Sequence, residues 1–210
     1  MFMNNIKSID PAELETKEVH KILLSSIAPR PIAFASTIDA KGSVNLSPFS
    51  YFNVFSSNPP ILIFSPSRRV RDNTTKHTLE NAKETKEVVI NIVNHSIVEQ
   101  MSKSSREYDK GVNEFLETGL TQVPSLKVKP PRVLESPISF ECKVDNIVSL
   151  GDSGGAGQLI IAKVVQIHIN KDYLDSEGGI DSEKLDLVAR MGGDWYTRVN
   201  KDSMFKIPKP

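Results

Sequence analysis

The segment from Ala33 to Thr78 holds the side chains best suited to bind a small molecule. One apolar run ends in the hydroxyl pair Ser36 and Thr37. A second run, Ile61 to Phe64, leads into a group of hydroxyl, guanidinium and carboxylate side chains: Ser65, Ser67, Arg68, Arg69, Arg71, Asp72, Thr74 and Thr75. Arginine forks and the free N–H groups at a helix start both favour an anion. We therefore predict a phosphate monoester here.

The stretch between the two apolar runs is rich in aromatic and amide side chains. It reads NLSPFSYFN from Asn45 to Asn53. Aromatic rings pack well against flat ligands, and amides and hydroxyls supply hydrogen bonds at a ring edge. The residues alone therefore favour a phosphorylated, planar cofactor.

Strand signals dominate the elements that would position these groups. Segments rich in β-branched and aromatic residues, bounded by Gly, Pro, Asn or Asp, predict strands at Ile32–Ile38, Val44–Phe49, Ile61–Ser65, Val88–Val93, Ile138–Leu150 and Gln158–Asn170. Helices are predicted at Asn73–Thr85, with Asp72 as N-cap, and at Ser96–Tyr108, with Asn94 as a cap. Two long consecutive strands across GDSGGAG predict a hairpin. The fold class is therefore mainly β, a closed or partly closed barrel with a few helices.

Length and composition limit the classes of protein that fit. A chain of 210 residues with 39% apolar content fits one domain, residues 1–210, with an N-terminal arm at 1–25, a proline-rich connector from Val123 to Pro137 and a C-terminal extension at 172–210. The 26 basic and 26 acidic residues cancel, which argues against a nucleic-acid partner. No signal peptide or membrane span is expected, and Cys142 allows no internal disulfide. We expect a soluble, cytoplasmic protein.

Two motifs suggest chemistry that we reject. Gly151-Asp-Ser-Gly-Gly155 resembles the nucleophile segment of trypsin-like proteases, but no histidine has the context of a general base. The same glycines precede a strand rather than a helix, so they do not form a dinucleotide fingerprint. A hairpin loop explains them. None of the four histidines has metal-ligand spacing, and His168 alternates with apolar residues on a strand. We predict neither a metal site nor a catalytic dyad.

Four segments in this order resemble the flavin reductase-like, FMN-binding split-barrel family: residues 26–65, 71–93, 113–144 and 189–199. This family includes the reductase components of two-component, flavin-dependent monooxygenases. The resemblance extends from about Ile27 to Val199, and its most specific pieces are the NLSPFS and DNTT sequences. Here Asn73 separates Arg71-Asp72 from Thr74, whereas relatives often have a Lys-Asp-Thr order.

The resemblance implies a six-stranded, Greek-key-like split barrel that forms a homodimer, with FMN in a groove at the subunit boundary. Ser36 and Thr37 would then end a strand next to the flavin. The ring and ribityl chain would lie along Asn45, Ser47, Phe49 and Ser50. The phosphate would lie among Ser65, Arg71, Asp72 and Thr74.

The activity that the resemblance implies is NAD(P)H-dependent reduction of FMN, with the reduced FMN supplied to a partner monooxygenase. Hydride would pass from nicotinamide C4 to flavin N5 across roughly 3 to 3.5 Å, which requires orientation rather than a catalytic side chain. Trp195, Tyr196 and the segment Asn113 to Leu120 could border the nicotinamide pocket. The alternatives are an electron-transfer flavoprotein of the flavoredoxin kind, a non-catalytic flavin-binding module, and a relative of pyridoxamine-phosphate oxidase.

Overall fold

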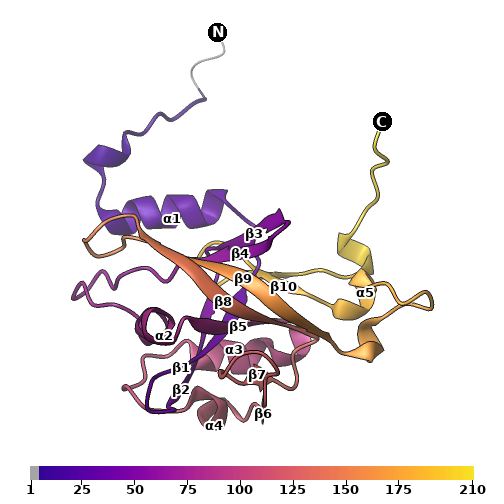
Figure 1. The fold of residues 1–210 in the computed structure, drawn as a ribbon. Coiled ribbons are helices and arrows are strands. Elements are labelled where there is room, and N and C mark those ends of the chain that lie inside the picture. Colours follow the sequence, from indigo (N-terminus) through magenta and orange to yellow (C-terminus); the bar gives the residue numbers. More distant parts are fainter. Residues whose placement is uncertain (1–4) are drawn as a thin grey trace.

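Seven antiparallel strands form the main sheet of this computed structural model, which describes residues 5–210 (Figure 1). The strand order is β2-β1-β5-β8-β9-β4-β3. The strands are β1 (Ala33–Ile38), β2 (Val44–Phe49), β3 (Phe52–Ser57), β4 (Pro60–Phe64), β5 (Glu87–Ile92), β8 (Ile138–Ser149) and β9 (Gln158–Ile169). Two small sheets pair β6 (Gln122–Val123) with β7 (Arg132–Val133), and β10 (Val188–Arg190) with β11 (Tyr196–Arg198).

The sheet is rolled around one apolar core. All seven strands contribute to it, from Ala35 and Val88 in the middle of the sheet to Phe49 and Phe52 on its two outermost strands. The rings of Phe49 on β2 and Phe64 on β4 lie 5.5 Å apart between centroids, which brings opposite parts of the sheet into contact. A sheet whose distant strands share a core has the form of a barrel. The predicted fold class, mainly β with a few helices, is confirmed.

A second core lies on the other face of β1 and β2. Successive side chains of a strand point to opposite faces, so Ala33 and Ala35 enter the barrel while Phe34 points outward. Phe34 packs with Leu46, Met101 and other apolar residues beneath α3 (Val98–Ser104) and α4 (Glu114–Thr118). Because both faces of β1 are covered, this strand is almost wholly buried.

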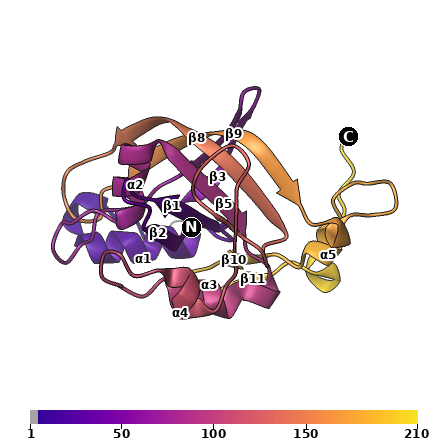
Figure 2. The same ribbon diagram turned by 60° about the horizontal axis from the view of Figure 1, so that its bottom comes forward.

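The other helices flank the barrel (Figure 2). Helix α2 (His77–Thr85) adds Leu79 and Ala82 to the barrel core. Helix α1 (Thr16–Ser26) has no buried residue, and α5 (Ser182–Leu185) is a single turn in the C-terminal extension. Short 3₁₀ turns occupy Pro11–Glu13, His95–Ile97, Lys171–Tyr173 and Lys201–Ser203. Within residues 5–210, no helix has the length and apolar content needed to cross a membrane.

The predicted elements need corrections. The second predicted helix, Ser96–Tyr108, is the shorter α3, Val98–Ser104, and its N-cap is Ile97 rather than Asn94. The main sheet has seven strands instead of six, because β3, whose Val54 and Phe55 are exposed, was not predicted. Helix α1 was also not predicted. Helix α2 begins at His77 with Lys76 as its N-cap, so the predicted start at Asn73 and the N-cap at Asp72 are wrong. Asn73 has a left-handed φ of 57°, which a helix cannot accommodate.

The proline-rich connector is held on the outside of the barrel by three buried side chains, Glu87, Asn91 and Glu141, which we call the connector clamp. Glu141 accepts hydrogen bonds from the N–H groups of Leu126 (2.7 Å) and Lys127 (2.5 Å) and contacts His168 Nε2 at 2.6 Å. In the same way, Asn91 Oδ1 accepts the N–H of Val133 (3.0 Å), and Glu87 accepts that of Lys129 (2.7 Å). His168 thus takes part in a structural network.

Candidate functional site

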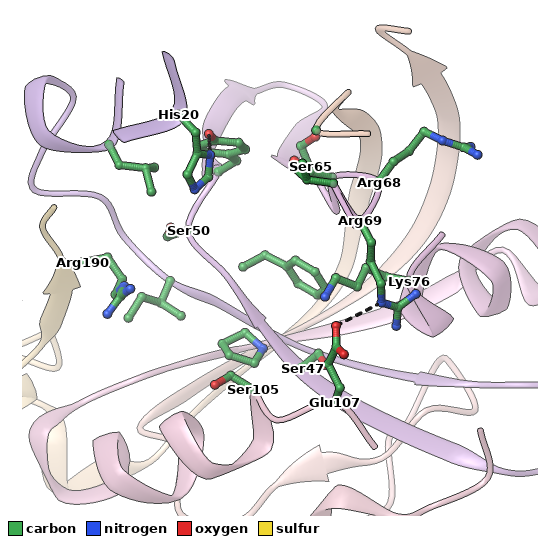
Figure 3. A pocket seen from close by; sticks show the side chains of 18 of the residues that line it. His20, Ser47, Ser50, Ser65, Arg68, Arg69, Lys76, Ser105, Glu107 and Arg190 are labelled. Atoms are coloured by element: carbon green, nitrogen blue, oxygen red, sulfur yellow. Dashed lines mark hydrogen bonds and ion pairs between the residues drawn. The ribbon is translucent and has the colours of Figure 1, made fainter. Parts of the chain in front are cut away.

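A cavity of about 580 Å³ opens where several elements meet at one side of the barrel (Figure 3). Its walls come from α1, the end of β2, the loop between β4 and α2, the residues after α3, the β8–β9 loop, and the β10–β11 pair. We call the loop between β4 and α2, residues 65–76, the basic loop. A volume of this size lies within the roughly 300–1,000 Å³ typical of small-molecule sites.

Half of the ten predicted binding residues line this cavity. They are Ser47, Phe49, Ser50, Ser65 and Arg71. The other five do not line it: Ser36, Thr37, Asn45, Asp72 and Thr74. The structure therefore brings together the middle of the NLSPFS segment and part of the basic loop.

The hydroxyl pair at the end of β1 lies inside the protein. Thr37 Oγ1 accepts a hydrogen bond from Asn81 Nδ2 at 3.2 Å, and Asn45 lies 2.9 Å from Thr78 Oγ1. Both contacts join the β1–β2 hairpin to α2. Ser36 is fully buried, and its Oγ has no partner among residues 5–210. Thr37 and Asn45 thus connect elements around the cavity, and neither they nor Ser36 line it.

Asp72 and Thr74 do not line the cavity but contact residues that do. Asp72 pairs with Arg71 (2.9 Å), and its other oxygen accepts from the Thr74 hydroxyl (2.6 Å) and the Thr74 N–H (3.0 Å). The bonds from Thr74, followed by that from Arg71, hold the pKa of Asp72 far below its usual range. Thr74 Oγ1 also accepts from Arg69 Nη1 at 3.0 Å. This network fixes the positions of the two guanidinium groups.

Glu107 lies between the two guanidinium groups at the cavity wall. Its carboxylate is 2.8 Å from Arg71 Nη1. It is also 3.5 Å from Arg69 Nε, the contact dashed in Figure 3. Hydrogen bonding to Arg71 lowers the pKa of Glu107, so this group is ionised at neutral pH. Two guanidinium groups around one carboxylate form a geometry that also suits a phosphate.

Lys76 is a cation that the sequence reasoning did not select. Its ammonium group lines the cavity close to Arg69, and no carboxylate of residues 5–210 lies within 4.0 Å of it. Burial, and then the charge of Arg69, lower the pKa of Lys76. A half-buried ammonium without a carboxylate in direct contact favours an anionic ligand. Its position just before α2 could have indicated this role, had the helix start been placed correctly.

The GDSGGAG segment braces the basic loop. It is the loop of the β8–β9 hairpin, as predicted. Arg68 N donates to Ala156 O (3.0 Å), Gly155 N donates to Arg68 O (2.9 Å), and the Asn73 amide donates to Asp152 O (2.8 Å). A Cβ at Gly154 would lie 2.9 Å from Val70 Cα, so the two loops touch through their backbones. Glycine is required here for close approach.

The remaining walls carry polar and aromatic groups. Ser65 Oγ accepts the N–H of Gln158 at 2.9 Å. Tyr51 OH lies 3.3 Å from His20 Nδ1, and burial raises the pKa of Tyr51. Arg190 lies on the side opposite Lys76 (Figure 3), and the ring of Tyr196 contacts Arg190. Sequence reasoning did not select His20, Tyr51 or Arg190 as binding residues. Tyr51 lies in the NLSPFSYFN segment and Arg190 in segment 189–199, whereas His20 lies on α1, which was not predicted.

The predicted border of a nicotinamide pocket is only partly found here. Tyr196 lines the cavity. Trp195 does not, and 76% of its surface is exposed. From the segment Asn113 to Leu120, only Glu114 lines a cavity, a smaller one next to the main site. Burial raises the pKa of Glu114, and its carboxylate accepts the N–H of Leu46 at 2.9 Å.

The donor set fits an anionic ligand with a flat ring. Five cationic side chains line the cavity against one carboxylate, Glu107. Phe49, Tyr51 and Tyr196 supply aromatic surface, and the serines supply hydroxyls. FMN combines a phosphate, a polyol chain and a planar ring, so the chemistry of these residues suits it.

Comparisons with known proteins agree with this description. The family model described as "Flavin reductase like domain" matches residues 25–184. An uncharacterized protein of Halalkalibacterium halodurans is 37% identical over 204 residues, which are 96% of each chain. The crystal structure of nitrilotriacetate monooxygenase component B from Bacillus cereus superposes with a TM-score of 0.90 at 31% identity, covering 97% of this chain and all of that one. A Shewanella frigidimarina protein described as a flavin reductase with a split barrel domain gives a TM-score of 0.78 at 30% identity, covering 95% and 96%.

Proposed function

The chain belongs to the flavin reductase-like family, and we propose that it is an NAD(P)H-dependent reductase of FMN. The observation that carries the proposal is the pairing of two features in one cavity. A basic side formed by Arg69, Arg71 and Lys76 lies next to the aromatic surface of Phe49 and Tyr51. A phosphate and a planar ring need these two surfaces at the same time.

We assign the phosphate of FMN to the basic loop. Lys76 has no counter-charge within 4.0 Å among the described residues, and Arg69 and Arg71 already face a carboxylate, that of Glu107. A phosphate would bring more charge than Glu107 and would compete with it for the same donors. Ser65 adds a hydroxyl on the barrel side.

The chain contributes binding and orientation rather than a covalent step. Bound FMN supplies the hydride-accepting chemistry. Phe49 and Tyr51 would hold the ring against the end of β2, and α1 places His20 and Leu24 over the cavity, where they limit access of water. Correct positioning of two reactants can itself supply a large part of a rate enhancement.

The direct test is oxidation of NADH or NADPH by the purified protein with added FMN under anaerobic conditions. We expect loss of the visible flavin absorption band with at least one of the nucleotides. If neither nucleotide reduces FMN, the proposed activity is wrong. Dialysis adds a second result: FMN that is lost fits a reductase that releases its product, whereas retained FMN with slow nicotinamide oxidation fits a flavoredoxin-like electron carrier.

The phosphate assignment has its own test. Arg71→Ala should weaken FMN binding by roughly 1.5–3 kcal/mol, the range for hydrogen bonds to charged groups, and should leave riboflavin binding nearly unchanged. Thr74→Val should have a smaller effect in the same direction, because the Thr74 hydroxyl acts through Arg69 and Asp72. Arg198→Ala is a matched control, because Arg198 pairs with Asp186 on the surface and does not line the cavity. Equal losses for FMN and riboflavin would refute the assignment.

The proposal also covers a partner monooxygenase, a second copy of this chain and the cellular compartment. The Bacillus cereus neighbour is a monooxygenase component, and we propose that this chain likewise supplies reduced FMN to a partner monooxygenase in the cytoplasm. We also propose a homodimer, supported by the exposed apolar side chains Val54 and Phe55 on the outermost strand β3. Sedimentation equilibrium tests the dimer. A monomer at micromolar concentration would contradict it.

A further inference from the structure

Arg190 is a cation with no role in the proposed phosphate site. It lines the cavity on the side opposite Arg69 and Lys76 (Figure 3). No carboxylate of residues 5–210 lies within 4.0 Å of its guanidinium group. Its Cζ lies 4.5 Å from the centre of the Tyr196 ring, a cation–π contact. The cavity therefore has two cationic sides.

The backbone around Arg190 fixes this side chain in place. Arg190 is paired with Tyr196 in the β10–β11 ladder. Its N–H and C=O exchange hydrogen bonds of 2.9 Å each with Arg30, and its Nη2 donates to Gly193 O at 2.9 Å. Gly193 has a φ of 60°, in the left-handed region. The guanidinium group is therefore oriented before any ligand binds, which lowers the entropic cost of binding.

A second guanidinium group reinforces the positive charge of this corner. Arg30 is buried, and it donates to the carbonyls of Leu24 (2.5 Å), Ile27 (2.6 Å) and Met191 (2.9 Å). These neutral acceptors satisfy its hydrogen bonds without cancelling its charge. Burial and then the neighbouring Arg190 lower the pKa of Arg30. The repulsion between the two cations is uncompensated until an anion arrives.

We propose that Arg190 and Tyr196 form a second anion subsite, which binds the phosphate that follows the nicotinamide riboside of the co-substrate. This inference rests on the proposed flavin reductase activity. FMN has one phosphate, and the basic loop accounts for it. The opposite cationic side then takes a second anionic group, and a nicotinamide nucleotide brings that group into the same cavity. The Tyr196 ring holds the guanidinium group of Arg190 at the cavity wall. The N–H groups of Arg190 that have no partner can then donate charge-assisted hydrogen bonds to the phosphate.

Three hydride donors of decreasing charge test the subsite. NADH carries a diphosphate, reduced nicotinamide mononucleotide carries one phosphate, and dihydronicotinamide riboside carries none. In Arg190→Gln, KM should rise roughly 10-fold or more for the two phosphate-bearing donors. For the riboside, KM should stay at the wild-type value. The turnover number should change little, because the lost contact binds ground state and transition state alike.

Two further variants separate binding from folding. Arg190→Lys keeps the charge and should recover part of the affinity for reduced nicotinamide mononucleotide. Lys83→Gln removes an exposed lysine of α2 that does not line the cavity, and should leave every KM unchanged. The ratio of FMN to riboflavin affinity in Arg190→Gln should equal that of the wild type.

Specific results would overturn the subsite. If KM in Arg190→Gln rises equally for all three donors, or for none of them, Arg190 does not bind the phosphate of the co-substrate. A lower ratio of FMN to riboflavin affinity would reassign Arg190 to the flavin phosphate. If wild-type protein oxidises none of the donors, the proposed activity fails. The subsite is then tested by calorimetry of NAD⁺ binding to the FMN-loaded protein. Weaker NAD⁺ binding by Arg190→Gln than by the wild type supports the subsite. No NAD⁺ binding by the wild type, or equal affinity in the two proteins, rejects it.

Discussion

The connector clamp and the basic loop use the same kinds of side chain for different purposes. In the clamp, the carboxylate of Glu141 is fully buried and has two backbone N–H donors and His168 as partners. In the basic loop, Arg71 is largely exposed, and Lys76 has no carboxylate within 4.0 Å among the described residues. Polar groups whose hydrogen bonds are complete stabilise the fold, whereas charges left without partners favour a ligand.

The difference extends to how each region is held. Each clamp residue projects from a strand of the main sheet and binds the backbone of the connector. The basic loop is held by the β8–β9 loop through backbone hydrogen bonds and the Asn73 amide, and its Lys76 side chain has no carboxylate within 4.0 Å among the described residues. Stability and ligand affinity should therefore respond separately to mutation in these two regions.

Glu141→Ala should have the largest effect, and it should act on stability. The substitution leaves two buried N–H groups and His168 without their acceptor, so the free energy of unfolding should fall by about 3 kcal/mol or more. Urea titration measures this loss. Asp145→Ala, an exposed carboxylate on the same strand, should change stability by no more than about 0.5 kcal/mol. Weakened FMN binding by the folded Glu141→Ala protein would contradict the separation.

Acid should remove the contribution of Glu141 from the wild-type protein. Burial alone would raise the pKa of this carboxyl, but hydrogen bonds from Leu126, His168 and Lys127 lower it below the ordinary value of 4.5. A carboxyl with a lower pKa in the folded state stabilises the protein above about pH 4.5, and this stabilisation is lost as pH falls through the folded value. Unfolding free energies of wild type and Glu141→Gln should therefore converge below about pH 4.5. A difference that is constant with pH would show that ionisation of Glu141 contributes nothing.

Lys76→Gln should act on ligand affinity alone. Loss of an ammonium bonded to the phosphate should weaken FMN binding by roughly 1.5–3 kcal/mol, with riboflavin nearly unaffected. The unfolding free energy of the ligand-free protein should stay the same or rise, because a half-buried charge next to Arg69 is removed. Fluorescence titration with both flavins and urea unfolding provide the two measurements. A less stable ligand-free protein would mean that Lys76 has a structural role.

Gly154→Ala should affect both regions through the backbone. Its Cβ would lie 2.9 Å from Val70 Cα and 3.0 Å from Arg69 O, so the basic loop must move. We expect roughly 1–2 kcal/mol of lost stability from overpacking, together with weaker FMN binding. Gly178→Ala in the C-terminal extension has no atom within 4 Å of the new Cβ but a left-handed φ of 83°, so it measures the cost of backbone strain without a clash. Unchanged FMN affinity in Gly154→Ala would show that the β8–β9 loop does not position the basic loop for binding.

Glu107→Gln should have the smallest effect, in the opposite direction. Removal of a carboxylate that competes for Arg69 and Arg71 should tighten FMN binding by about 0.5–1 kcal/mol, the size of an exposed ion pair. Riboflavin affinity should be unchanged, which fluorescence titration can check. Weaker FMN binding would indicate that Glu107 helps to orient the guanidinium groups.

The sequence predicted the barrel better than its cavity. Six strands were found because each is a compact β-branched or aromatic run, whereas β3 was missed because its exposed tip mixes polar and apolar residues. Ser36 and Thr37 were predicted next to the flavin because they end an apolar run and because the family resemblance implies that position. Here both faces of β1 are covered, and strand periodicity alone does not show that. Lys76 and Arg190 line opposite sides of the same cavity, although they are 114 positions apart in the sequence.

The hydrogen bond from Arg30 to Met191 joins residues 161 positions apart. Closing so long a loop has a high entropic cost, so we expect this corner of the cavity to assemble after the local strand pairs. On the ribosome, the barrel strands are all synthesised before Met191 is added. Binding of the nicotinamide co-substrate is thereby expected to come late in synthesis: a nascent chain that stalls before Arg190 can build much of the barrel and the basic loop but has only one of the two cationic walls.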